Sequence, residues 1–159
     1  MRPARTTTIA CLRGFSLVEL TFVMMVIGIM TALALPRYSN ALARYRADAT
    51  ARRIVADLNL ARAQARSTST TQPVVFDLIN NNYQLPGVTT LDRRSTNYQV
   101  NLAGAPYYST LSSVDFATTT QVTFSIFGEA DNSGTIVITA GEATKTITFD
   151  ATNSSATIQ

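Results

Sequence analysis

The sequence predicts an α+β protein in which one long N-terminal helix packs on a small antiparallel β-rich head. Three observations predict this class. An unbroken apolar run follows the first 14 residues, and its length suits a helix rather than a strand. Residues 37–66 then repeat apolar side chains at steps of three and four. From residue 74 onward the chain changes to short runs rich in Val, Ile, Thr and Phe, separated by Asn, Gly and Pro.

The apolar run from Phe15 to Leu35 contains 21 residues and a single charged side chain, Glu19. A helix of this length spans roughly 31 Å, which is about the thickness of the hydrocarbon core of a bilayer, so the run can cross a membrane. A carboxylate in such a run costs roughly 2.5–3.5 kcal/mol at mid-bilayer and less near the edge. Glu19 therefore indicates a function and requires a partner.

Residues 36–66 are expected to continue this helix into the head. Pro36 has no backbone N–H and is predicted to kink the junction. The arginines of this stretch fall mostly away from the apolar stripe. They indicate either a solvated face with i,i+4 ion pairs, which we favour, or contact with acidic neighbours or lipid headgroups. The apolar stripe consists of Ala51, Ile54, Val55, Leu58, Ala61 and Ala65.

The remainder of the chain is expected to form an antiparallel meander of short strands. The polar segment 67–73 ends the helix, and Pro73 closes it. Asn80-Asn81-Asn82 predicts a turn, because Asn tolerates a left-handed backbone, and Pro86-Gly87 is expected to stop the following strand. The predicted strands cover residues 74–79, 83–85, 97–102, 122–127, 135–139, 145–149 and 156–158, and the rest of 87–121 is expected to be loop.

Composition excludes several classes of function. The chain has 159 residues, no histidine, no tryptophan and one cysteine, Cys11. Because Cys11 precedes the apolar run, no thiol occurs in or after it. Thiol nucleophiles, histidine-based triads and the usual zinc sites are therefore excluded from that part of the chain, and we expect no enzyme activity, no cofactor and no metal. The net charge of +3 equals the charge of Arg2, Arg5 and Arg13, which all precede the apolar run, so the basic pI is a poor argument for nucleic acid.

Two weaker patterns, for calcium binding and for nucleic-acid binding, have simpler interpretations. Glu129 and Asp131-Asn132-Ser133-Gly134 offer oxygen ligands that calcium prefers, but they lack the spacing of an EF-hand loop, and a β-turn is the better interpretation. Arg93-Arg94, with tyrosines nearby, could contact nucleic acid. Residues 67–159 nevertheless hold three basic against seven acidic side chains, so DNA binding is not favoured.

The start of the apolar run resembles the class III leader of type IV pilins and type II secretion pseudopilins. The matching residues are Gly14, Phe15, Ser16, Leu17, Val18, Glu19 and Leu20, and Pro36 matches a proline common in pilins. The resemblance implies cleavage between Gly14 and Phe15 by a membrane prepilin peptidase and N-methyltransferase on the cytoplasmic side. It also implies methylation of the new Phe15 amine and assembly of the helix into a filament core.

Charge pairing gives this resemblance a physical basis. Cleavage would create an ammonium group on Phe15, and a carboxylate four residues along can compensate it. Two opposite charges attract strongly where the dielectric constant is low, and an unpaired buried charge is heavily penalised. The hypothesis is that Glu19 pairs with the Phe15 amine of a neighbouring subunit, so that each added subunit is held in register.

The end of the helix is similar to the pseudopilin H / minor pilin T group, whose members show an L-x-x-A-R-x-x-A run before the first strand. Leu58, Ala61, Arg62 and Ala65 fit this run. The resemblance implies a minor pseudopilin of a type II protein secretion system, near the tip of a short periplasmic pseudopilus that supports export across the outer membrane. Its partners would be the peptidase, other pseudopilins or pilins, and membrane lipid.

The implied organisation is a leader at 1–14, a transmembrane and filament-core helix at 15–35, an amphipathic helix at 36–66 and a periplasmic head at 67–159, with a pseudopilin H-like domain at about 50–155. The protein would be a single-pass inner-membrane protein with a cytoplasmic N-terminus. Two alternatives stay open. One is a minor pilin of a type IV pilus, serving adhesion or DNA uptake. The other is an exported β-rich binding domain released after Ala34 by signal peptidase.

Overall fold

The computed structural model describes residues 14–89 and 97–159. The chain divides into two compact units, Met1–Tyr38 and Ser39–Gln159. Helix α1 spans Leu17–Thr68 and contributes to both, running through Pro36 without interruption. The long helix is therefore confirmed, whereas the kink at Pro36 stays a prediction. Residues 1–13 of the expected leader lie outside the described residues, as do Arg93 and Arg94.

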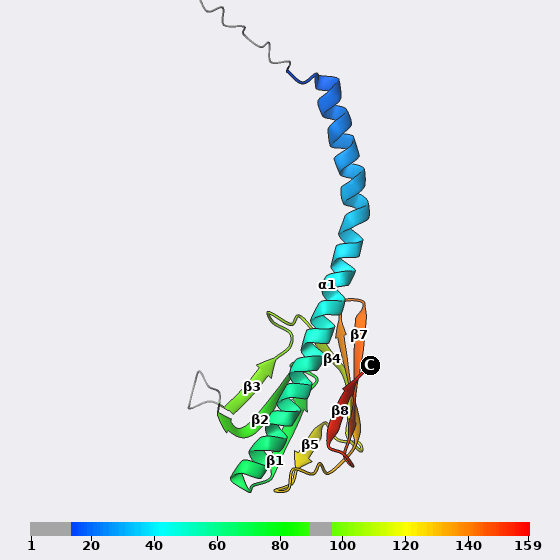
Figure 1. Ribbon diagram of the computed structural model, residues 1–159. Helices are drawn as coiled ribbons and strands as arrows, with labels where there is room; N and C mark the ends of the chain where they lie inside the picture. Colours follow the sequence, from blue (N-terminus) through cyan, green and yellow to red (C-terminus); the bar gives the residue numbers. More distant parts are fainter. Residues whose placement is uncertain (1–13, 90–96) are drawn as a thin grey trace, which may run out of the picture. The chain divides into compact units, whose positions relative to one another are not determined.

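The head, Ser39–Gln159, contains two four-stranded antiparallel sheets (Figure 1). The strands are β1 (Gln72–Asp77), β2 (Asn82–Thr89), β3 (Asn97–Asn101), β4 (Thr110–Asp115), β5 (Gln121–Phe124), β6 (Gly134–Ala140), β7 (Ala143–Asp150) and β8 (Ser155–Ile158). Their orders in the two sheets are β3-β2-β1-β5 and β4-β6-β7-β8. The meander that the sequence indicated is wrong, because β5 returns to pair with β1 and β4 pairs with β6.

Strand β4 lies in a stretch that was expected to be loop. Its buried apolar residues, Leu111 and Val114, are three positions apart instead of two or four. The register of β4 on β6 shifts between Leu111 and Ser113, and this bulge places both side chains on one face. The sequence therefore lacks the regular alternation by which a strand is recognised.

Strand β2 continues through Pro86-Gly87, which were expected to end it. The register with β3 shifts between Leu85 and Thr89, so the proline sits in a bulge where no ladder donor is required of it. Gly87 has a φ of +82° there, which suits a residue without a Cβ. The turn expected before β2 is present, and Asn81 holds the left-handed backbone with a φ of 49°.

The core lies between α1 and the two sheets, and Figure 1 shows the C-terminal half of the helix lying along them. The small side chains on this face of α1 let the helix approach the strands closely. Aromatic rings join the sheets: Phe76 stacks on Phe116 at 6.0 Å, and Phe149 meets Phe116 and Phe124 edge to face. The predicted stripe is buried at Ala51, Ile54, Leu58, Ala61 and Ala65, while Val55 is partly buried.

A buried carboxylate fixes α1 to the first sheet. Asp57 is 4% exposed. Its Oδ2 accepts hydrogen bonds from Tyr83 Oη at 2.5 Å and from Arg53 Nε at 3.1 Å, and Tyr98 Oη donates to Oδ1 at 2.9 Å. Arg53 also donates to the hydroxyl of Tyr98. The cluster of Arg53, Asp57, Tyr83 and Tyr98 therefore links one helix turn to β2 and β3.

This cluster shifts the pKa values of its members. Burial raises the pKa of Tyr83 far above its ordinary value, and the negative charge of Asp57 raises it further. Burial and the hydrogen bond to Asp57 raise the pKa of Tyr98 in the same direction. Partial burial lowers the pKa of Arg53, but the negative charge of Asp57 and the interactions with Tyr98 and Tyr107 together outweigh this effect, so the pKa is raised overall. The folded head thus keeps both hydroxyls protonated and the guanidinium charged.

Two arginines clamp the end of α1 to distant loops. Arg66 Nε donates to the carbonyl of Phe127 at 2.7 Å, and Arg62 Nε donates to that of Gly128 at 3.0 Å. Arg62 Nη1 also donates to the carbonyl of Ser154 at 3.2 Å. Gly128 has a φ of +73°, and a Cβ there would lie 2.3 Å from Arg66 Nε. The loop between β5 and β6 is therefore shaped to accept these donors.

Gly134→Ala is expected to destabilise the head. An added Cβ would lie 2.3 Å from the carbonyl oxygen of Asp115 and 2.4 Å from Phe116 Cδ1, so backbone or ring has to move. Overpacking of this kind costs about 1–3 kcal/mol, which a lower melting temperature would report. Gly104→Ala is the matched control, since its Cβ would meet nothing within 4 Å. Equal melting temperatures for the two variants would contradict the packing at Gly134.

Asp57→Ala is expected to lower the free energy of unfolding by about 3–5 kcal/mol, because it leaves a guanidinium and a buried hydroxyl without their acceptor. Asp48→Ala provides the comparison on the same helix. Asp48 pairs with Arg52 at 2.8 Å with the same four-residue separation, but that pair is exposed to solvent, so its loss should change the free energy of unfolding much less. Denaturant titration measures both values, and similar costs would refute the role of burial.

The stability of the head is expected to fall as the pH rises above about 10. The unfolded chain loses its tyrosine protons there, whereas the raised pKa of Tyr83 keeps the folded state protonated, so deprotonation favours unfolding. The contribution is complete below that pH. Tyr83→Phe should show a shallower alkaline loss in denaturant titrations at pH 8–11. A loss as steep as in the unaltered protein would sink this assignment.

Candidate functional site

The predicted processing residues lie at the beginning of α1. Gly14, Phe15 and Ser16 precede the helix, and the ring of Phe15 is 79% exposed. The first helical hydrogen bond runs from Leu20 N to the carbonyl of Ser16 at 3.0 Å. Glu19 lies in this first turn. A carboxylate there is favoured by the unpaired N–H groups and the positive end of the helix dipole.

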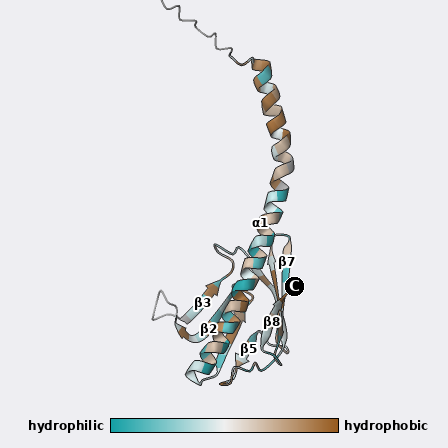
Figure 2. Cartoon of the chain, viewed as in Figure 1, coloured by the Kyte–Doolittle hydropathy of each residue, from teal (hydrophilic) through white to brown (hydrophobic). Residues whose placement is uncertain are grey.

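The surface of α1 that follows is apolar on all sides and exposed, and Figure 2 shows its N-terminal half in mainly hydrophobic colours. Within the described residues, α1 is the helix that is long and apolar enough to cross a membrane. A continuous apolar surface of this size marks a membrane or protein interaction site. The exposed side chains include Leu17, Val18, Leu20, Phe22, Val23, Met24, Met25, Val26, Ile27, Ile29, Met30 and Leu35.

Most arginines on the head's part of α1 are engaged within the head. Arg52 and Arg53 form the two i,i+4 ion pairs, and Arg62 and Arg66 bind loop carbonyls. The guanidinium of Arg46 lies 4.7 Å from the centre of the Tyr108 ring, as a cation–π contact. The favoured interpretation, a solvated face with ion pairs, is therefore only partly confirmed. Four of these arginines contact segments of the head outside α1.

Two cationic side chains of the described head are left over. The side chains of Arg44 and Lys145 form no ion pair, hydrogen bond or ring contact with another described residue. Both line one groove of about 290 Å³ between α1 and the beginning of β7, together with Ala47, Ala143 and Thr144. The proximity of these two residues could not be predicted from the sequence, because 100 residues lie between them.

Asp131, one of the residues that could have suggested a calcium loop, has a structural role. Asp131 Oδ1 accepts a hydrogen bond from Thr123 N at 3.0 Å and so joins the two ends of the loop between β5 and β6. In residues 14–89 and 97–159, no group of three or more Asp, Glu, Cys or His side chains could hold a metal ion. The β-turn interpretation is thus consistent with the role of Asp131.

Sequence reasoning missed the Asp57 cluster. Its signal was present: Asp57 lies beside Leu58 and three positions after Ile54, on the stripe that was expected to be buried. A charged side chain on a buried stripe requires partners. Those partners, Tyr83 and Tyr98, come from strands whose order the sequence did not reveal.

The chain is similar to known proteins both in sequence and in fold. Residues 50–153, more than half of the chain, match the sequence model of GspH, described as type II transport protein GspH. The fold is similar to that of the minor pseudopilin EpsH from the type 2 secretion system of Vibrio cholerae, with a TM-score of 0.52 and 14% identity, over 72% of this chain and 96% of that chain. No curated protein sequence gives a significant match. The sequence model and the fold confirm the resemblance that the leader and helix end indicated.

Proposed function

The chain belongs to the GspH family of type II transport proteins, and from this premise we propose that it is a minor pseudopilin of a type II protein secretion system. It assembles through its N-terminal helix, together with other pseudopilins, into a short periplasmic pseudopilus and lies near the tip. The pseudopilus supports the export of folded proteins across the outer membrane. The role of this subunit is structural rather than enzymatic.

The observation that carries this proposal is the combination of the family match with the exposed apolar half of α1. The head buries its own core, whereas the large apolar side chains described between Leu17 and Leu35 are exposed. Exposed apolar surface is unfavourable in water by about 25 cal/mol per Å². A bilayer removes this surface from water before assembly, and neighbouring helices do so within a filament.

Processing follows from the same helix. Cleavage between Gly14 and Phe15 by a prepilin peptidase removes the leader, and methylation of the Phe15 amine follows. Gly14 and Phe15, the residues on either side of the cleaved bond, precede the helix and are exposed, which favours access by a peptidase. The protein is anchored before assembly as a single-pass protein of the inner membrane, with its N-terminus in the cytoplasm and its head in the periplasm.

Glu19 is the carboxylate that holds the assembled helix in register. Before cleavage it lies among the free N–H groups of the first turn of α1. After cleavage, the Phe15 ammonium of a neighbouring subunit supplies a full positive charge. No ion pair joins Glu19 to another described residue, so its charge is free for such a partner. Pro36 then allows the helix to bend where the apolar segment ends.

Glu19→Ala is expected to be processed but not incorporated. Cleavage does not require the carboxylate, whereas assembly leaves the neighbouring ammonium unpaired in apolar surroundings. In cells that depend on this subunit, secreted protein should accumulate in the periplasm, and the variant should be absent from sheared or cross-linked filaments. Glu129→Ala removes a similarly exposed carboxylate from the head and should secrete normally. Normal secretion and incorporation by Glu19→Ala would refute the pairing.

The mass and N-terminal sequence of the mature protein test prepilin processing separately from filament assembly. An N-methylated start at Phe15 supports prepilin processing, and a start at Leu35 in a soluble fraction would overturn it in favour of a signal peptide. Loss of surface pili with intact secretion, after deletion of the subunit, would instead assign the protein to a type IV pilus.

A further inference from the structure

The groove that contains Arg44 and Lys145 has the features of a binding site for a phosphate group. Arg44 comes from α1, and Lys145 is the third residue of β7. Ala47 and Ala143 leave the space between helix and strand unfilled, and Thr144 adds a polar residue to the lining. The volume of about 290 Å³ is close to the lower end of the range for small-molecule sites.

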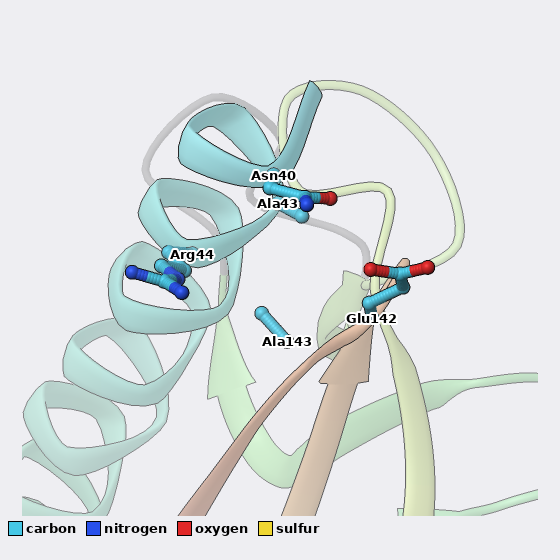
Figure 3. Close-up of a pocket in the computed structure, with 5 residues that line it drawn as sticks. All are labelled: Asn40, Ala43, Arg44, Glu142 and Ala143. Atoms are coloured by element: carbon cyan, nitrogen blue, oxygen red, sulfur yellow. The ribbon is translucent and has the colours of Figure 1, made fainter. Parts of the chain in front are cut away.

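A second, smaller hollow of about 100 Å³ adjoins this groove and shares Arg44 and Ala143 with it. Figure 3 shows Asn40 on α1 and Glu142 on the hairpin at either side of the hollow. Glu142 is exposed and forms no ion pair with another described residue, although Arg44 lines the same hollow. Arg44 therefore borders both parts of this depression, with Lys145 lining the larger groove and Glu142 lining the smaller hollow.

We propose that this depression binds the headgroup of an amine-bearing phospholipid, phosphoethanolamine. The phosphate lies between Arg44 and Lys145, because both side chains donate charge-assisted hydrogen bonds to phosphate oxygens. The ammonium group of the headgroup lies toward Glu142, whose carboxylate accepts its hydrogen bonds. Each charge of the headgroup thus meets an unpaired charge of opposite sign on the protein.

The position of the site along the chain favours a lipid over an acidic segment of another protein. Asn40, which lines the hollow, follows Leu35 by five residues, so the site belongs to the stretch next to the proposed membrane span. Basic side chains in such stretches are attracted to lipid phosphates, and the long stem of arginine lets its charged end reach them. An acidic segment would satisfy the cations but would be repelled by Glu142.

A lipid titration tests the proposal on the full chain in dodecylmaltoside micelles. The amide resonances of Ala47, Thr144 and Lys145 are followed while dioctanoyl phosphatidylethanolamine is added. We expect saturable shifts with this lipid, and affinity at least ten-fold lower for the double variant Arg44→Gln/Lys145→Gln. Arg52→Gln is the control, because it removes an exposed arginine of the same helix outside the groove. Superimposable resonances elsewhere show that each variant is folded.

The other probes identify the source of binding. Dioctanoyl phosphatidylcholine, whose amine cannot donate hydrogen bonds, should bind more weakly, and Glu142→Gln should remove this difference. Equal saturation by inorganic phosphate would assign the groove to a free anion, and stronger binding of a glutamate-rich peptide would assign it to a protein partner; either result overturns the proposal. So would shifts that persist in the double variant. The inference rests on the proposed membrane anchor, but the titration measures neither processing nor secretion, so the two can fail separately.

Discussion

A single buried carboxylate determines how the helix lies on the head. Asp57 is almost fully buried, and its donors come from α1 itself and from β2 and β3. An uncompensated charge in a protein interior is strongly destabilising, so this cluster has to form as a unit. Once it is formed, α1 cannot rotate or slide on the first sheet without separating Arg53 and Asp57 from the two tyrosines. The part of α1 that belongs to the head, from Ser39 onward, is therefore held in one fixed register relative to the strands.

The two halves of α1 solve the problem of apolar burial in different ways. In the head, one stripe of mostly small residues is buried against the sheets, and the opposite face carries arginines that bind neighbouring carboxylates, carbonyls and a tyrosine ring. In the N-terminal half, the apolar side chains surround the helix, and the described chain provides nothing to cover them. A helix that is apolar all round needs a bilayer or other proteins as its partner. This asymmetry is the physical basis for the proposal that the chain serves as a filament subunit with a membrane anchor.

Local patterns were sufficient for the parts of the fold that depend on neighbouring residues. The period of the helix, the Asn81 turn and the C-terminal strands β6, β7 and β8 could be predicted, because their signals lie within a few residues of one another. Strand β4 could not, since a bulge changes its alternation, and neither could the pairing of β1 with β5. The Asp57 cluster and the groove at Arg44 depend on contacts between residues that are far apart in sequence. Only the resemblance of the leader and helix end, rather than any pattern of charge or polarity, indicated the biological role.

The strand order also decides when the head can fold. β1 cannot pair with β5 until β5 has been synthesised. Arg62 likewise cannot bind the carbonyl of Ser154, which follows it by 92 residues, until Ser154 has been synthesised. Contacts between distant residues form slowly, because a long loop has to close before any bond rewards it. The helix and the first strands therefore lack a large share of their packing until the last residues of the chain have been synthesised. A polypeptide with this topology cannot complete its core before β5 and Ser154 have been synthesised, so the head has to fold as one late, cooperative step.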